Sequence, residues 1–204
     1  VAHTAAALCD GIVAPPIAYT PAPFNTSFPG TVSITPELFE EMLAQVCQGL
    51  LNQGFRGVFI VNGHGANLDP ARSVAFSLPK GAVHIQSWWD PEPVALLRAE
   101  MFGEWEGMHA TPSEIAITQA IHGCKPAGAA ANPPEKLSPA YIAAHGGDKH
   151  GPPDEHRARF PDGRVGSHSA LATPELGRDL IKAASAALAT EFARFSLARR
   201  ATDA

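Results

Sequence analysis

The sequence predicts an α/β fold built on a mainly parallel sheet. Short apolar runs rich in β-branched residues alternate with longer segments whose apolar residues recur at helical spacing. One run, Gly57–Val61, is apolar throughout, which is typical of a strand covered on both faces. The chain has 204 residues, 45% of them hydrophobic. This length predicts a single domain over residues 1–204.

The first part of the chain contains one strong helix signal. A helix that ends at Gly11 is expected first, followed by short strands at 12–20 and 32–35. Thr35 then caps a helix with Pro36 in its first turn. Apolar residues recur at helical spacing in this segment: Leu38, Phe39, Met42, Leu43, Val46, Leu50 and Leu51.

Helices and strands continue to alternate after the run at 57–61. The expected elements are a helix at 69–76, a strand at 82–89, a helix at 92–102, a helix after the capping box Thr111–Glu114, and a final helix from Thr173. The segment 123–170 is rich in Gly, Pro and Ala. A loop region of this length is usually functional or an oligomer contact.

Composition and charge exclude some partners. The formal net charge is −5 and there is no long basic run, so no nucleic-acid partner is expected. No apolar run reaches the roughly 20 residues that span a bilayer, so no membrane partner is expected. The cysteines Cys9, Cys47 and Cys124 form no CxxC pair, which predicts reduced thiols in a cytoplasmic protein. The chain starts at Val1 inside a helical pattern, so we expect an N-terminally incomplete chain.

The loop Asn62–Asn67, with the sequence NGHGAN, follows the central predicted strand. Ligands of open α/β sheets bind at the carboxyl ends of strands. Gly63 and Gly65 would let the backbone turn tightly around His64, whose imidazole suits zinc, iron or manganese. The alternative is an ordinary strand-to-helix turn with a hydrogen-bonded histidine.

A second polar group lies in residues 103–117, which include Trp105, Glu106, His109 and Glu114. A histidine and a carboxylate could converge here for proton transfer and metal binding. Alternatively, Glu114 only completes the capping box and Trp105 packs in the core.

Further candidates are less specific. Trp88 and Trp89 follow a predicted strand and could wall a pocket or pack in the core. The Gly-rich segment 161–169 could cradle an anion or turn a loop. His84 is expected in the core. The remaining histidines without metal spacing are expected at the surface or in loops: His3, His122, His145, His150 and His156.

Taken together, these motifs resemble the creatininase (creatinine amidohydrolase) family. The ordered matches run from about Ile12 to Gly177. They are a Phe-Pro-Gly-Thr stretch at 28–31, the Asn-Gly-His-Gly-x-Asn loop at 62–67, the His-Ala-x-x-x-Glu segment at 109–114 and a Gly-rich loop at 163–167. The tryptophan four residues before His109 also fits.

The resemblance implies a three-layer α/β/α fold and hydrolysis of an amide or lactam C–N bond of a small molecule by metal-activated water. It makes His64 and Glu114 ligands of divalent metal ions, expected to be zinc, manganese or iron. His109 would transfer a proton to the leaving nitrogen. Since the family often forms hexamers, a homo-oligomer is expected.

The tryptophans also gain roles from the resemblance. Trp89 and Trp105 match substrate-facing tryptophans and are counted with His109 as catalytic residues. Asn67 and Trp88 are expected to bind the substrate.

The sequence also departs from the family pattern. The family's first metal motif, Glu-x-His-Gly followed by an Asp, is not found. Ala66 stands where creatininase itself has a ligand Glu, and Asn25 stands where many members carry a His. A second hypothesis is therefore a degenerate, non-catalytic member that acts in small-molecule binding or assembly.

Overall fold

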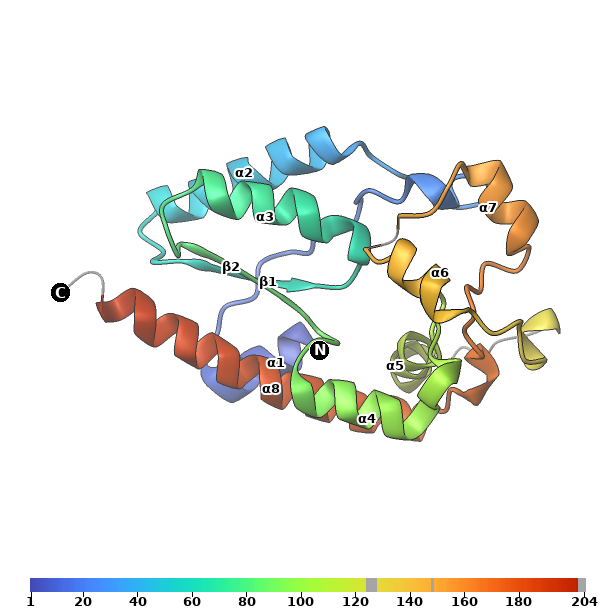
Figure 1. Ribbon diagram of the computed structural model, residues 1–204. Coiled ribbons are helices and arrows are strands. Elements are labelled where there is room, and N and C mark those ends of the chain that lie inside the picture. The colour runs from blue at the N-terminus through green and yellow to red at the C-terminus, as the bar shows by residue number, and fades with distance from the viewer. Residues whose placement is uncertain (124–127, 148, 202–204) are drawn as a thin grey trace. The chain divides into compact units, whose positions relative to one another are not determined.

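The computed structural model describes residues 1–123, 128–147 and 149–201 (Figure 1). The chain forms two compact units. The first consists of Val1–Pro23, Val32–Pro91 and the segment from Ser185, and the second of Phe24–Thr31 and Glu92–Ala184. The expectation of one domain stays a prediction. Cys124 lies outside the described residues.

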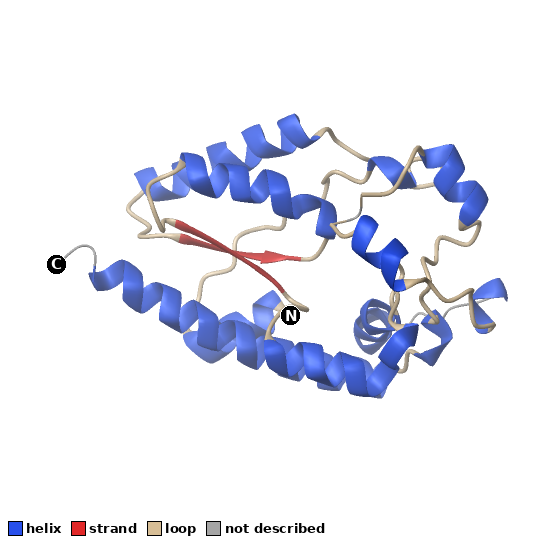
Figure 2. Cartoon of the chain, in the orientation of Figure 1, coloured by secondary structure: helices blue, strands red, loops and turns tan. Residues whose placement is uncertain are grey.

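The first unit contains a parallel two-stranded sheet. Strand β1 (Val58–Asn62) pairs with β2 (Val83–Ser87), so that Val58 lies opposite Val83 and Asn62 opposite Ser87. The helix α3 (Leu68–Ser77) connects the strands. Figure 2 shows both strands among helices. The predicted α/β class with a parallel sheet is confirmed.

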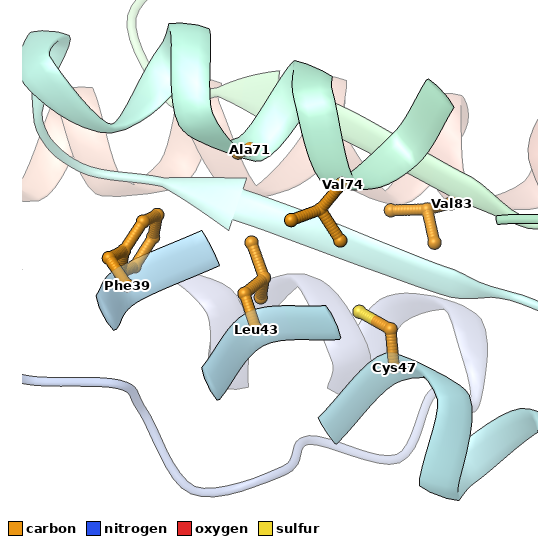
Figure 3. Close-up of a cluster of buried hydrophobic side chains, with 6 residues drawn as sticks. All are labelled: Phe39, Leu43, Cys47, Ala71, Val74 and Val83. Atoms are coloured by element: carbon orange, nitrogen blue, oxygen red, sulfur yellow. The ribbon is translucent and has the colours of Figure 1, made fainter. Parts of the chain in front are cut away.

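Helix α2 (Pro36–Asn52) and α3 form a core with one face of this sheet. Thr35 accepts a hydrogen bond from the backbone nitrogen of Leu38, as its predicted capping role requires. In Figure 3 the α2 side chains point toward α3 and β2, and the six buried residues are Phe39, Leu43, Cys47, Ala71, Val74 and Val83. The α2 members are four residues apart, which places them on one face of the helix. Burial raises the pKa of the Cys47 thiol.

Aromatic rings cover the other face of the sheet. Phe59 and His84 lie opposite each other in the register, and their rings stack with centroids 5.0 Å apart. Phe195, from the last helix α8 (Pro174–Ala201), packs 5.9 Å from both rings. His84, expected in the core, is therefore a half-buried member of this stack. Within the first unit, helices cover both faces of the sheet.

Several expectations for the first unit were wrong in detail. Residues 12–20 and 32–35 form no strand among the described residues, and Pro15 and Pro16 cannot donate ladder hydrogen bonds. Val58–Val61 are half-buried rather than fully buried. The first helix, α1, spans Ala2–Cys9. Its C-cap is Asp10, whose φ of 53° is left-handed, and not Gly11.

The second unit is mainly helical. Its elements are η1 (Pro23–Asn25), whose last two residues belong here, α4 (Glu92–Phe102), η3 (Gly103–Trp105), α5 (Pro112–His122), η4 (Gly128–Ala131), α6 (Pro139–Ala144), α7 (Pro153–Arg159), η5 (Ser169–Leu171) and the first part of α8. The predicted loop at 123–170 thus contains short helices. Ser138 caps α6 by accepting from the backbone nitrogen of Tyr141. His156, expected at the surface, is 4% exposed in α7.

No helix in the described part of the chain has both the length and the apolar character needed to cross a bilayer.

A tight helix contact in the second unit gives a stability prediction. A Cβ on Gly177 of α8 would overlap the carbonyl oxygen of Ala116 and lie 2.9 Å from the Cβ of Ala120, both in α5. Gly177→Ala is therefore expected to lower the free energy of unfolding by about 1–3 kcal/mol. A Cβ added to Gly49 in α2 would meet no atom within 4 Å, so Gly49→Ala is the control. This substitution is expected to raise the free energy of unfolding by about 0.5–1 kcal/mol. Urea denaturation measures both, and two changes of the same sign would contradict this packing argument.

Candidate active site

In the first unit, the side chain of Asn62 organises the loop after β1. Asn62 is 4% exposed, and its Nδ2 donates to the carbonyl of His64 and to the Ser87 hydroxyl. Its Oδ1 accepts from the backbone nitrogen of His64 at 3.2 Å and from Asn67 Nδ2 at 3.3 Å. One amide therefore joins the ends of both strands to the backbone of His64.

This arrangement changes the explanation of the turn. Gly63 has no positive φ, and a Cβ there would meet open space. The turn is thus held by the Asn62 amide and does not require glycine at position 63. Asn67 lies at the start of α3, and its Oδ1 is buried without a hydrogen-bond partner among the described residues. This oxygen suits the predicted role of Asn67 in substrate binding, which stays a prediction.

The two predicted pocket tryptophans also belong to the first unit. Trp88 is 8% exposed, and its backbone nitrogen donates to the carbonyl of Asn62. Trp89 is half-buried, and the two rings meet edge to face with centroids 5.9 Å apart. Trp88 is thus largely buried, while Trp89 presents more surface, and the predicted role of Trp88 in substrate binding stays a prediction.

In the second unit, the ring of His109 is held from two sides. Its Nε2 lies 2.9 Å from Asn25 Nδ2, and the ring of Phe24 meets it edge to face at 5.5 Å. Phe24 is 2% exposed, so this contact is part of a packed core. The half-buried imidazole therefore has a fixed position.

The backbone of His109 is fixed as well, by the Gly-rich segment near the end of the chain. The backbone of His109 forms an antiparallel bridge with Val165, and Ser167 Oγ donates to the carbonyl of His109 at 2.7 Å. Ala110 has a left-handed φ of 51°, and its carbonyl accepts from Ser169 Oγ at 2.6 Å. Because αL is costly for alanine, these bonds must stabilise an unfavourable backbone conformation. The segment 164–169 acts here as a clamp on His109–Ala110.

Glu114 completes the capping box at the start of α5. Its Oε2 accepts from the backbone nitrogen of Thr111 at 3.0 Å and from Thr111 Oγ1 at 2.9 Å. In return, Thr111 Oγ1 accepts from the backbone nitrogen of Glu114. The capping alternative for Glu114 is therefore present in the structure, and its role as a metal ligand stays a prediction.

Next to this cap, Glu106 forms a largely buried ion pair. Its Oε1 lies 2.8 Å from Arg98 Nη2 and accepts from the Ser113 hydroxyl. The side chains of Arg98 and Glu106 are 20% and 15% exposed. Ser113 Oγ in turn lies 3.1 Å from Thr111 Oγ1. A continuous polar network thus supports the segment between His109 and α5.

Trp105 is the second predicted catalytic residue of this unit, after His109. Its half-buried ring meets the ring of His168 edge to face at 5.6 Å, and Lys136 Nζ lies 4.5 Å from its centroid. Lys136 also pairs with Glu104 at 2.8 Å. Burial and, second, the charge of Arg164 lower the pKa of His168, which favours the neutral imidazole beside Trp105.

The structure therefore brings the predicted residues into two groups. His64, Asn67, Trp88 and Trp89 belong to the first unit, and Trp105, His109 and Glu114 to the second. That these groups form one site stays a prediction. Throughout the described ranges, no group of three or more His, Cys, Asp or Glu side chains is arranged to hold a metal ion.

Sequence reasoning missed four residues that shape these groups. Asn62 gave a usable signal, because it is a polar residue at the end of an apolar run. Asn25, Ser167 and Ser169 stood out only as a departure from the family pattern or as parts of the Gly-rich segment. Nothing local indicated their contacts with residues 109 and 110, which lie 58 to 84 residues away in the chain.

The chain is similar in sequence to known proteins. The family model described as "Creatininase: Creatinine amidohydrolase" matches residues 1–192. A curated relative, the mycofactocin precursor peptide peptidase of Mycolicibacterium smegmatis, is 42% identical over 118 residues, which is 56% of this chain and 46% of that protein. The chain thus matches about half the length of this relative.

Solved structures of creatininases have a fold similar to that of this chain. A protein of Bacteroides fragilis NCTC 9343 assigned to the creatinine amidohydrolases superimposes with a TM-score of 0.70 at 22% identity, over 95% of this chain and 78% of that one. A creatinine amidohydrolase (creatininase) gives 0.65 at 19% identity, over 94% and 78%. A manganese creatininase and a zinc–zinc mutant form give 0.60 and 0.61 at 20% and 19% identity, each over 92% of this chain and 77% of that one.

Proposed function

Because the chain belongs to the creatininase family, we propose that it hydrolyses the C–N bond of an amide substrate. Members of this family are hydrolases. For this chain, the reaction would add water across the bond, giving a carboxylic acid and an amine.

The observation that carries this proposal is the fixation of His109. Its ring is held by Asn25 and Phe24, and its backbone by Val165 and Ser167. A proton donor works only when it lies within hydrogen-bond reach of the atom that it serves. The unfavourable φ of Ala110 supports the same reading, because strained backbone of this kind concentrates at functional sites.

In the proposed reaction, the oxygen of water bonds to the carbonyl carbon and loses one proton to the solvent, and the C–N bond breaks with its electron pair on nitrogen. His109 gives a proton to that nitrogen, which then leaves as a neutral amine. Trp105, in the same unit as His109, would offer an aromatic surface to the substrate.

A divalent metal, zinc or manganese, belongs to the proposal because solved creatininases include both forms. His64 and Glu114 are donors of suitable chemistry, but catalytic zinc sites carry three protein ligands. Glu114 Oε2 is already engaged by Thr111, and no cluster of three such donors occurs in the described residues. These side chains alone do not fit a complete metal centre, and we assign no step of the reaction to a metal.

The substrate class that we favour is a peptide-type amide. The support is the relative named as a peptide peptidase, which is more similar in sequence than the solved creatininases. Creatinine and other lactams are the competing substrates, and the same assay separates the two classes.

The test is a hydrolysis assay on the purified chain with added zinc or manganese. The substrates are a panel of short peptides and a panel of lactams that includes creatinine, and release of amine is the readout. Hydrolysis of peptides supports the proposal, whereas hydrolysis of lactams alone would overturn the choice of substrate. No release of amine from any substrate would favour the second candidate, a non-catalytic family member, with which the lack of a three-donor cluster among the described residues agrees.

A metal-binding prediction follows from the short ligand set. After incubation with zinc and dialysis, the chain is expected to retain less than about one zinc ion, since two protein ligands hold zinc weakly. His64→Ala is expected to weaken binding by at least about tenfold, as loss even of outer-shell partners costs 10- to 100-fold. Elemental analysis measures the bound metal, and His3→Ala, which removes an exposed histidine of α1, is the control. Retention of two zinc ions per chain would contradict the argument.

A further inference from the structure

The contact between Asn25 and His109 joins segments that are 84 residues apart in the chain. The Nδ2 of Asn25 lies 2.9 Å from the Nε2 of His109. Asn25 lies in the turn η1 directly after Phe24, whose ring packs against the same imidazole. Two adjacent residues of one turn thus hold the imidazole of His109: Phe24 packs against its ring, and Asn25 contacts its Nε2.

Hydrogen-bond chemistry assigns the proton in this state. An amide nitrogen only donates, so Nε2 of His109 must accept, and a neutral imidazole then carries its proton on Nδ1. The Oδ1 of Asn25 is buried and has no hydrogen-bond partner among the described residues. Oδ1 belongs to the same amide group as Nδ2 and is similar in size to it, but it accepts a hydrogen bond where Nδ2 donates one.

We propose that Asn25 is the positioning residue of His109, and that its amide binds Nε2 in both charge states of the imidazole. When Nε2 takes up a proton from a hydronium ion of the solvent, leaving water, it becomes a donor. A half-turn of the amide then replaces Nδ2 by Oδ1, which accepts this hydrogen. Nε2 keeps that proton, so the proton that His109 gives to the leaving nitrogen is the one on Nδ1. The resting state returns when Nδ1 takes up a proton from the solvent and Nε2 gives its proton to the solvent. This inference rests on the proposed function of His109.

An amide suits this role better than the alternatives. A carboxylate can only accept, so it would keep the proton on Nε2 and hold the imidazolium too strongly. An apolar side chain would leave Nε2 without a partner in a packed environment. Two further imidazoles pack against the ring of Phe24, those of His150 and His156, with centroids 4.6 and 5.0 Å from its own.

The test reads the tautomer of His109 directly, by ¹⁵N NMR of the histidine-labelled chain without substrate. In the wild type at alkaline pH, Nε2 is expected to carry no hydrogen and Nδ1 to carry it. In Asn25→Asp, which is nearly the same size and so is expected to fold, the hydrogen is expected on Nε2. In Asn25→Ala, a mixture of both tautomers is expected. Asn52→Ala, an exposed amide of α2, is the control and should leave the His109 signals unchanged.

Turnover provides the second readout. Asn25→Ala is expected to lower kcat by about 10- to 100-fold with little change in KM, since a small misplacement of a catalytic group costs this much. The same tautomer in the wild type and in both Asn25 variants would overturn the inference. The inference would also be overturned if Asn25→Ala left kcat unchanged while His109→Ala abolished turnover. Absence of hydrolysis in the wild type, with the expected tautomers present, would count against the proposed function alone.

Discussion

Replacing His109 by alanine is expected to lower kcat of amide hydrolysis by about 10²–10⁴-fold, the range for loss of a general acid. KM should change little, because the imidazole acts on the leaving nitrogen and not on substrate binding. The effect should be this large because contacts to Asn25, Phe24 and Ser167 fix the ring and its backbone. The measurement is steady-state kinetics on a substrate that the wild type hydrolyses.

Two further variants separate proton transfer from structure. His109→Gln keeps a polar side chain near Asn25 but carries no transferable proton, so it should lose as much activity as alanine. Added imidazole should restore part of the turnover of His109→Ala, because a small base can occupy the emptied space. His3→Ala, in the first unit, should match the wild type. If His109→Gln retained wild-type turnover, His109 would not be the proton donor.

The second large effect is expected at Gly107, which contacts the clamp at 164–169. Gly107 has a φ of 66°, and a Cβ there would lie 2.5 Å from the backbone nitrogen of Ser167 and 2.6 Å from the carbonyl carbon of Gly166. Gly107→Ala therefore combines a left-handed alanine with backbone overlap. We expect a loss of roughly 3 kcal/mol or more in the free energy of unfolding, or displacement of the clamp.

Gly103 is the matched control for this substitution. It also has a positive φ, 52°, but a Cβ there would meet no atom within 4 Å. Gly103→Ala should thus cost only the conformational term of about 1–2 kcal/mol. Urea denaturation and the NMR signals of the His109 ring measure both outcomes. Equal destabilisation by the two substitutions, with unchanged His109 signals, would show that the clamp does not approach Gly107 closely.

Local signals in the sequence predicted the helices and the paired strands well. Thr35-Pro36 and Thr111-Pro112 start helices as expected, because the threonine oxygen accepts from a backbone nitrogen of the first turn. Ser138-Pro139 carries the same signal inside the segment predicted to be a loop, and the helix that it starts is only six residues long. The prediction of a strand at 12–20 was wrong. An apolar segment forms a strand only where a neighbouring strand lies beside it to form hydrogen bonds, and the local sequence does not show whether one does.

The candidate site was predictable only in part. The motif at 62–67 identified His64, but the residue that holds the turn is Asn62, through four hydrogen bonds of its amide. The capping box identified Glu114 because its partners are three residues away. Asn25 and Ser167 were not predictable, because their contacts with His109 depend on tertiary structure.

The long-range character of the His109 contacts has a consequence for folding. Closing a chain segment costs entropy that rises with its length, by about 0.6 kcal/mol for each doubling. The contacts of His109 with Asn25 and Ser167 close segments of 84 and 58 residues, whereas the capping bonds of α5 span three. Helix α5 can therefore form early, and the imidazole acquires its fixed position late. Partial opening of the chain would release this geometry before it melts the helix beside it.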